Sequence, residues 1–125
     1  MEIKQVQSVS VFVSDQERAL NFYTQALGLE LHLDATYSPG YRRIEVAPRG
    51  ATTGIALVKP QPGQPDSLIG ATMSFVLATD DIVGTYAELL DRGVEFVEPP
   101  APQPCGGMQA IFADLDGNRF VLAEC

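Results

Sequence analysis

The chain repeats one pattern twice, and this repeat limits the possible folds more than any other feature of the sequence. An offset of 66 positions aligns three pairs of residues: Ser8 with Ser74, Val13 with Thr79, and Asp15 with Asp81. The glycines that close the two predicted helices, Gly28 and Gly93, align only after a shift of one residue. A period near 65 residues is too long for a solenoid, and two copies are too few. We therefore expect two similar modules that share one core.

Each copy has the periodicity of a βαβββ module, in which alternating residues indicate strands and short oxygen-bearing side chains cap helices. In the first module we expect strands at 6–13, 29–33, 41–47 and 53–58. Its helix follows Ser14 and Asp15 and ends at Gly28. In the second module we expect strands at 72–78, 94–97, 109–113 and 120–123. Its helix follows Asp80 or Asp81 and ends at Gly93, and residues 114–118 form a turn. The predicted fold class is α+β, with two tandem βαβββ modules whose curved mixed sheets form a cleft.

A proline-rich segment separates the two copies. Residues 59–66 read KPQPGQPD, which suits neither a helix interior nor a central strand, so we expect an exposed linker. The chain is then a single domain of residues 1–125. Its first module covers about 1–58, its linker 59–69 and its second module about 70–125.

Composition excludes several classes of partner. Eight Lys and Arg against sixteen Asp and Glu give a formal net charge of −8, which is the wrong sign for binding nucleic acid or an anionic membrane. No apolar run approaches the ~20 residues of a membrane span, and the N-terminal residues lack a signal-peptide layout. Cys105 and Cys125 form neither a disulfide framework nor a CxxC motif, and two free thiols suit a reducing compartment. We therefore predict a cytoplasmic protein.

Three runs carry a family resemblance: VSDQERALNFYTQALGLEL, TDDIVGTYAELLDRGVEF and FADLDGNRFVLAE. They resemble the vicinal oxygen chelate superfamily, which contains glyoxalase I, extradiol dioxygenases and bleomycin-resistance proteins. The resemblance covers essentially the whole chain. It implies paired βαβββ modules that form a cleft and usually a homodimer. One activity does not follow, because this scaffold supports several chemistries.

Metal-dependent members of the family hold their ion through His, Gln or Glu on the first and last strands of each module. The resemblance puts these four positions on Ser8, Ala56, Ser74 and Val121, none of which is such a ligand. We therefore expect no metal and no other cofactor. The four side chains should converge on one cavity.

The cleft predicted from strand alternation is small or apolar, with hydroxyl groups that would orient a ligand. Its predicted lining comprises Ser8, Ser10, Phe12, Arg42, Ala56, Val58, Ser74, Val76, Cys105 and Val121. Arg42 and Arg43 alternate in one strand, so only one of them faces the cleft, where it would anchor an anionic ligand. Cys105 lies in a predicted loop beside the cleft and reads as a spectator thiol, because no base is near it. His32 reads as an outward strand residue, and the three residues Tyr37, Tyr41 and Tyr86 as structural or rim residues.

Three functions fit this sequence. The first is a metal-independent protein that binds a neutral or weakly anionic organic molecule as a homodimer. The second is a lyase, isomerase or dioxygenase-type enzyme with no metal or with displaced ligands such as Glu45 or Glu124. The third is a regulatory dimer with a vestigial cleft.

Overall fold

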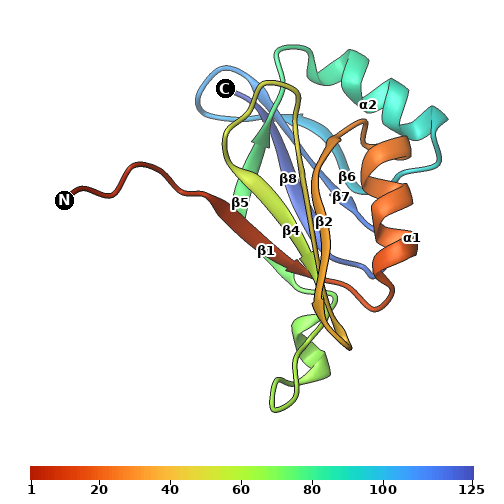
Figure 1. The fold of residues 1–125 in the computed structure, drawn as a ribbon. Coiled ribbons are helices and arrows are strands. Elements are labelled where there is room, and N and C mark those ends of the chain that lie inside the picture. The colour runs from red at the N-terminus through yellow and green to blue at the C-terminus, as the bar shows by residue number, and fades with distance from the viewer. The chain divides into compact units, whose positions relative to one another are not determined.

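The computed structural model describes all 125 residues, which divide into an N-terminal unit, Met1–Ile69, and a C-terminal unit, Gly70–Cys125. Each unit holds one four-stranded mixed sheet with a helix against one face (Figure 1). The predicted α+β fold with two βαβββ modules is confirmed. No helix is long and apolar enough to cross a membrane.

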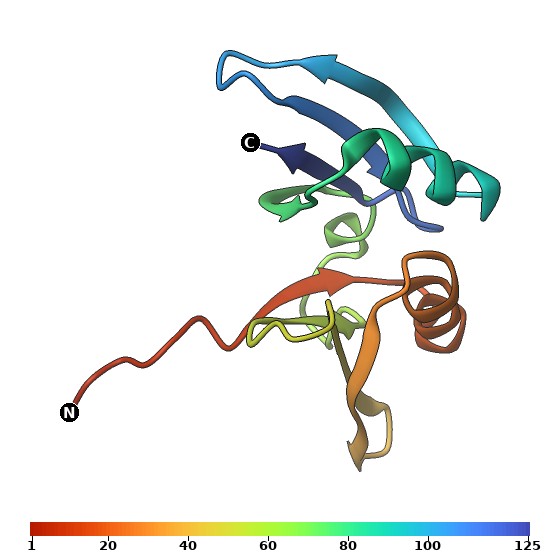
Figure 2. The same ribbon diagram turned by 90° about the horizontal axis from the view of Figure 1, so that it is seen from above.

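The sheet of the N-terminal unit has the strand order β1-β4-β3-β2, in which β1 and β4 are parallel and the other pairs antiparallel. Its elements are β1 (Ser8–Phe12), α1 (Gln16–Asn21), a π-helical stretch (Phe22–Ala26), β2 (Glu30–Ser38), β3 (Tyr41–Ala47), β4 (Gly54–Val58) and a 3₁₀ turn (Asp66–Leu68). Residues 1–5 lead away from the sheet and are exposed (Figure 2).

The C-terminal unit repeats this topology with the strand order β5-β8-β7-β6 and a parallel β5–β8 pair. Its elements are β5 (Thr72–Ala78), α2 (Ile82–Asp91), β6 (Glu95–Pro102), β7 (Met108–Ala113) and β8 (Arg119–Glu124). Identical strand orders in the two units are what the sequence repeat predicts.

Equivalent aspartates begin the two helices. The carboxylate of Asp15 accepts a hydrogen bond from the Arg18 amide at 3.1 Å, and that of Asp81 accepts one from the Gly84 amide at 3.0 Å. In both helices the bonded amide lies three residues after the cap, where it has no partner within the helix. The predicted caps are confirmed, with Asp81 rather than Asp80 in the second helix.

The one-residue difference between the two helices lies in the π-helical stretch. Gly28 follows Asp15 by 13 positions, whereas Gly93 follows Asp81 by only 12. The Leu27 amide donates to the Phe22 carbonyl, five residues back, at 3.1 Å. This wider turn accommodates one extra residue. Both helices then end at a glycine with positive φ, 72° at Gly28 and 86° at Gly93.

The core of each unit lies between its helix and its sheet. In the N-terminal unit Val11, Ile44 and Leu57 are fully buried, as is Tyr23 from the π-helical stretch. In the C-terminal unit a row of aromatic rings crosses the sheet from β5 to α2. Successive ring centroids along it lie 4.6–5.8 Å apart, in the order Phe75, Phe120, Phe112, Phe96 and Tyr86. Tyr86 therefore has the structural role expected of it.

The Asp114–Asn118 segment is a turn, as predicted, and two buried polar side chains hold it in place. Asp114 accepts hydrogen bonds from the Asp116 and Asn118 amides, both at 2.9 Å. The Asn118 side-chain oxygen accepts from the amides of Gly70 at 2.8 Å and Ala71 at 3.1 Å. The turn before β8 is thereby fastened to the residues that lead into β5.

Two predicted strands are too short. The strand predicted at 29–33 extends to Ser38, and the strand predicted at 94–97 extends to Pro102. Proline lacks the amide that a central strand must donate, which is why the second prediction stopped before Pro99. However, β6 is an edge strand, where a missing donor leaves no neighbour unpaired.

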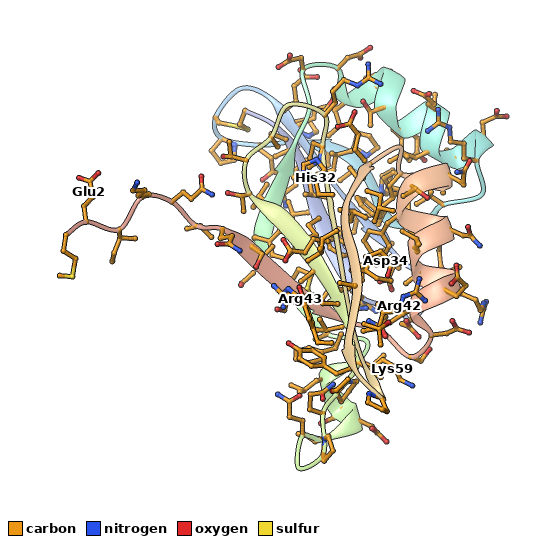
Figure 3. The ribbon with its side chains drawn as sticks, viewed as in Figure 1. Glu2, His32, Asp34, Arg42, Arg43 and Lys59 are labelled. Carbon is orange, nitrogen blue, oxygen red and sulfur yellow. A yellow bond between two sulfur atoms is a disulfide. The ribbon has the colours of Figure 1, made fainter.

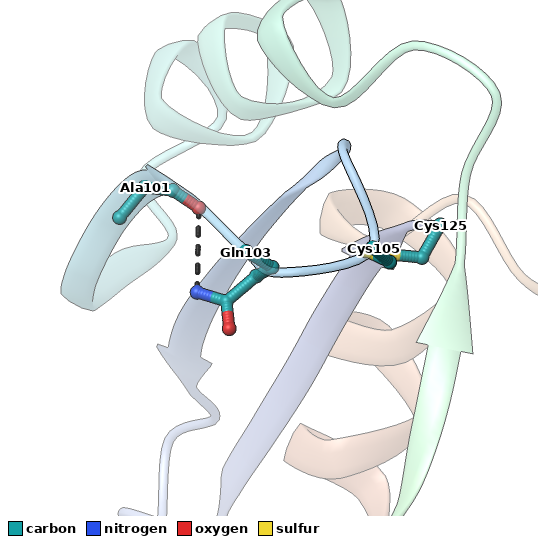
Figure 4. The surroundings of a disulfide bond; sticks show 4 residues. All are labelled: Ala101, Gln103, Cys105 and Cys125. Atoms are coloured by element: carbon teal, nitrogen blue, oxygen red, sulfur yellow. Dashed lines mark hydrogen bonds between the residues drawn. A yellow bond between two sulfur atoms is a disulfide. The ribbon is translucent and has the colours of Figure 1, made fainter.

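The two cysteines form a disulfide, which corrects the prediction of a spectator thiol at Cys105 (Figure 4). The β7–β8 register pairs Met108 with Glu124. The loop before β7 therefore lies beside the residue after β8, and the Cα atoms of Cys105 and Cys125 are 6.0 Å apart. Gly107 lies so close to the Glu124 carbonyl that a Cβ atom there would collide with it. With both sulfurs bonded, the cysteines no longer argue for a reducing compartment.

Candidate functional site

The N-terminal sheet has a face of mixed polar and apolar residues opposite the face that α1 covers. In the parallel β1–β4 pair, Ser10 lies beside Ala56 and Phe12 beside Val58. In the antiparallel β3–β4 pair, Glu45 lies beside Ala56. Residues paired across strands share a face. The even-numbered residues of β1 and β4 therefore share this face with the odd-numbered residues of β3.

A pocket of about 360 Å³ opens on this face. Strands and the proline-rich linker both contribute to its walls. Its lining residues are Ser10, Phe12, Tyr41, Arg43, Val58, Lys59, Gln61 and Gln64. We call it the N-terminal pocket. Of the predicted cleft residues, Ser10, Phe12 and Val58 line it.

Arg43 is held in one orientation within this pocket. Its Nε donates to Glu45 Oε2 at 2.7 Å, and its Nη2 donates to the Ser8 hydroxyl at 3.1 Å. The side chains of Arg43 and Glu45 are only 24% and 14% exposed. The hydrogen bond to Glu45 raises the pKa of the guanidinium above its usual value, and Tyr41 adds to this effect. Arg43 is therefore a permanently charged, pre-oriented donor.

Arg42 points to the opposite side of the sheet (Figure 3). Its Nη2 lies 2.7 Å from Asp34 Oδ2, and its Nη1 lies 3.0 Å from Glu17 Oε1 on α1. These bonds raise the pKa of Arg42, and the hydrogen bond from Arg42 lowers the pKa of Asp34. The prediction that Arg42 faces the cleft is corrected, because Arg43 is the arginine that lines the pocket.

Three pocket residues were missed by sequence reasoning, which treated the linker only as an exposed connection. Lys59 directly follows β4, and Gln61 and Gln64 come from the next five residues. The Gln61 amide donates to Gln64 Oε1 at 2.8 Å, and Gln61 Nε2 donates to the Lys59 carbonyl at 3.2 Å. The sequence holds one indication that the linker contributes to the pocket: Lys59 follows the predicted cleft residue Val58 and is one of only two lysines in the chain.

The other predicted cleft residues lie in both units. Ser8 accepts a hydrogen bond from the pocket residue Arg43, and Ala56 is fully buried in the same sheet. In the C-terminal unit Val76 pairs with Val121, while Ser74 is exposed on β5. Convergence of these residues with the N-terminal pocket stays a prediction.

The residues at the family's metal positions do not fit a divalent ion. In the N-terminal unit the Ser8 hydroxyl accepts a hydrogen bond from the Arg43 guanidinium, a positive charge that would repel a cation. Ala56, at the second metal position of this unit, has no side-chain atom that could coordinate a metal ion. The displaced ligands considered above are engaged elsewhere, since Glu45 pairs with Arg43 and Glu124 Oε2 accepts from the Ile82 amide at 2.7 Å. No group of three His, Cys, Asp or Glu side chains is placed to hold a metal ion.

No carboxylate, histidine or cysteine lines the pocket. Cys105 is bonded to Cys125, and His32 lies on β2, half-exposed and 3.8 Å from Glu30 Oε1. His32 is thus an outward strand residue, as predicted.

Known proteins resemble this chain over nearly its full length. An uncharacterized protein of Bacillus subtilis, YetH, is 35% identical over 122 residues, covering 98% of this chain and 99% of the relative. A crystal structure from Sphaerobacter thermophilus, of a member of the glyoxalase/bleomycin resistance protein/dioxygenase superfamily, is 40% identical with a TM-score of 0.89 and 97% coverage of both chains. The crystal structure of TnmS3, an antibiotic binding protein from a Streptomyces species, is 39% identical with a TM-score of 0.84, and covers 98% of this chain and 97% of that one. A family model matches residues 5–122. The chain therefore belongs to the Glyoxalase/Bleomycin resistance protein/Dioxygenase superfamily.

Proposed function

We propose that this protein binds a small organic molecule in the N-terminal pocket without a divalent metal and without changing the ligand chemically. The observation that carries the proposal is the pocket itself, which combines apolar walls with one fixed charged donor. This is the usual composition of a small-molecule site. The similarity to TnmS3, which is described as an antibiotic binding protein, supports the same function.

The enzyme alternative has less support. The general base or nucleophile of a lyase or isomerase is most often a carboxylate, a histidine or a cysteine near the substrate. The pocket lining has neither a carboxylate, a histidine nor a cysteine. Glu45, the nearest carboxylate, is paired with Arg43. Holding a ligand is therefore the function that these side chains suit best.

A thermal-shift panel tests the proposal. Antibiotics, other drug-like compounds and metabolites would be added to the protein with and without EDTA. A ligand at 100 times its dissociation constant stabilises the fold by about 2.7 kcal/mol, which raises the Tm of a chain of this size by about 10 °C. We expect at least one compound to give such a shift in both buffers. Shifts that require added Ni²⁺ or Zn²⁺ would contradict metal independence.

A variant that fills the N-terminal pocket tests whether the ligand binds there. Ser10→Trp puts a large ring on the exposed pocket face and should abolish the shift. Ala87→Trp puts the same ring on the exposed face of α2 and serves as the control, with binding unchanged. Equal binding by both variants would exclude the N-terminal pocket as the site.

We also propose that the protein acts as a homodimer, as the family resemblance implies. Light scattering at micromolar concentration checks this, with the mass of two chains as the expected result. A stable monomer would contradict it.

A further inference from the structure

The N-terminal pocket concentrates positive charge in an acidic protein. The chain has a formal net charge of −8, with only eight Lys and Arg residues, yet two of these eight, Arg43 and Lys59, line this one pocket. None of the lining residues is Asp or Glu. The local charge therefore has the opposite sign to that of the whole molecule.

The two cations differ in what they already bind. Glu45 neutralises Arg43, and together with Ser8 it fixes the plane of the guanidinium. Lys59 is exposed and forms no ion pair within the protein. After Arg43 and Glu45 cancel, the pocket keeps the charge of Lys59. An unpaired cation in the same pocket as a fixed guanidinium is a suitable receptor for one anionic oxygen group.

The rest of the lining suits a flat apolar body. Phe12 and Val58 are neighbours in the sheet, and the Tyr41 ring lies on the same face. The Tyr41 ring is also in contact with Tyr37, with centroids 5.8 Å apart. Two aromatic side chains and one aliphatic side chain can therefore contact a ring system while its polar end reaches the cations.

We infer that the ligand class of this pocket is an aromatic carboxylate, with its carboxylate at Lys59 and Arg43 and its ring system against Phe12 and Val58. This inference rests on the proposed function, since it names the chemistry of the molecule bound there. It narrows the expectation of a neutral or weakly anionic ligand to an anion with one negative group.

The test compares two probes of the same shape, 2-naphthoate and its neutral amide, 2-naphthamide, by calorimetric titration. The key variant is Lys59→Gln, and the matched control is Lys4→Gln. Lys4 is the other lysine of the chain, and it is exposed outside the pocket, so the control makes the same change in net charge. Arg43→Gln combined with Glu45→Gln removes the buried pair together and leaves no unpaired carboxylate behind.

We expect wild type to bind naphthoate more tightly than naphthamide. Lys59→Gln should weaken naphthoate by about 1.5-fold to fivefold, the range of one exposed charge pair, and leave naphthamide unchanged. Lys4→Gln should change neither, and the Arg43/Glu45 double variant should weaken naphthoate in particular. Equal affinities for the two probes, or equal losses from the two lysine variants, would overturn the carboxylate inference.

The Ser10→Trp variant separates this failure from a failure of the proposed function. If both probes bind equally and Ser10→Trp blocks both, the pocket binds organic molecules and only the carboxylate inference is wrong. If neither probe binds at millimolar concentration, or if Ser10→Trp has no effect on either, the pocket and the inference are both rejected.

Discussion

The disulfide between Cys105 and Cys125 should contribute a large share of the stability of this protein. The bond joins the β6–β7 loop to the chain end after β8, with a sequence separation of 20 residues. In the chain-entropy model, closing a loop of this length removes unfolded-state entropy worth about 3 kcal/mol at 25 °C. Net stabilities of small proteins are only about 5–15 kcal/mol, so this loss would be easy to measure.

Urea unfolding with and without the reductant TCEP measures this contribution. With an m-value of about 1.5 kcal/mol/M, reduction should lower the midpoint by about 2 M. Cys125→Ser cannot form the bond, so its midpoint should match that of the reduced wild type and should not respond to TCEP. Mass spectrometry of the alkylated protein before each titration confirms the redox state.

Two results would refute this reasoning. Two freely reactive thiols in native protein purified without reductant would show that the bond does not form. An unchanged midpoint after verified reduction would show that contacts of Gly107 and the β7–β8 register hold the loop without it.

Further predictions concern the core and the turn of the C-terminal unit, and the ion pair between Asp34 and Arg42. Phe120→Ala removes the ring that lies between Phe75 and Phe112 in the aromatic row and should cost about 3–5 kcal/mol in urea unfolding, whereas Phe120→Leu should cost less. Asn118→Ala leaves the partly buried amides of Gly70 and Ala71 without this acceptor and should cost about 1–3 kcal/mol, with faster amide exchange just before β5 as the specific readout. Asp34→Asn should cost under about 1 kcal/mol at neutral pH, because the pair with Arg42 is partly exposed. The folded pKa of Asp34 is lowered, so its contribution is fully present above the ordinary value of 3.8 and is lost as pH falls through the folded value. The difference between wild type and Asp34→Asn should therefore vanish in acid, and a difference that persists would contradict this assignment.

Features that depend on neighbouring residues in the sequence were predictable. The caps at Asp15 and Asp81 and the glycine ends at Gly28 and Gly93 follow from local backbone chemistry. The two βαβββ modules follow from the sequence repeat and the family resemblance.

Features that depend on strand register were not predictable from one sequence. Alternation shows that Arg42 and Arg43 face opposite sides, but pairing of β3 with β4 decides which of them shares a face with Ser10. The same reason applies to the disulfide, because only the β7–β8 register places the loop of Cys105 beside Cys125. The contribution of Lys59 to the pocket depends on the path of the linker, which residue periodicity does not determine.

The π-helical stretch also has a consequence for how this protein tolerates changes in length. One residue added to a regular helix turns every later side chain by about 100° about the axis. The wide turn at Phe22–Ala26 absorbs that rotation within one turn, so that Gly28 still reverses the chain into β2 as Gly93 does into β6. When the sequences of the two units are aligned, the one-residue gap therefore belongs inside the helix and not in a loop. Deleting Thr24 should convert the stretch to an ordinary α-helix of the length found in the other half, and it is the single-residue deletion that this unit should survive best.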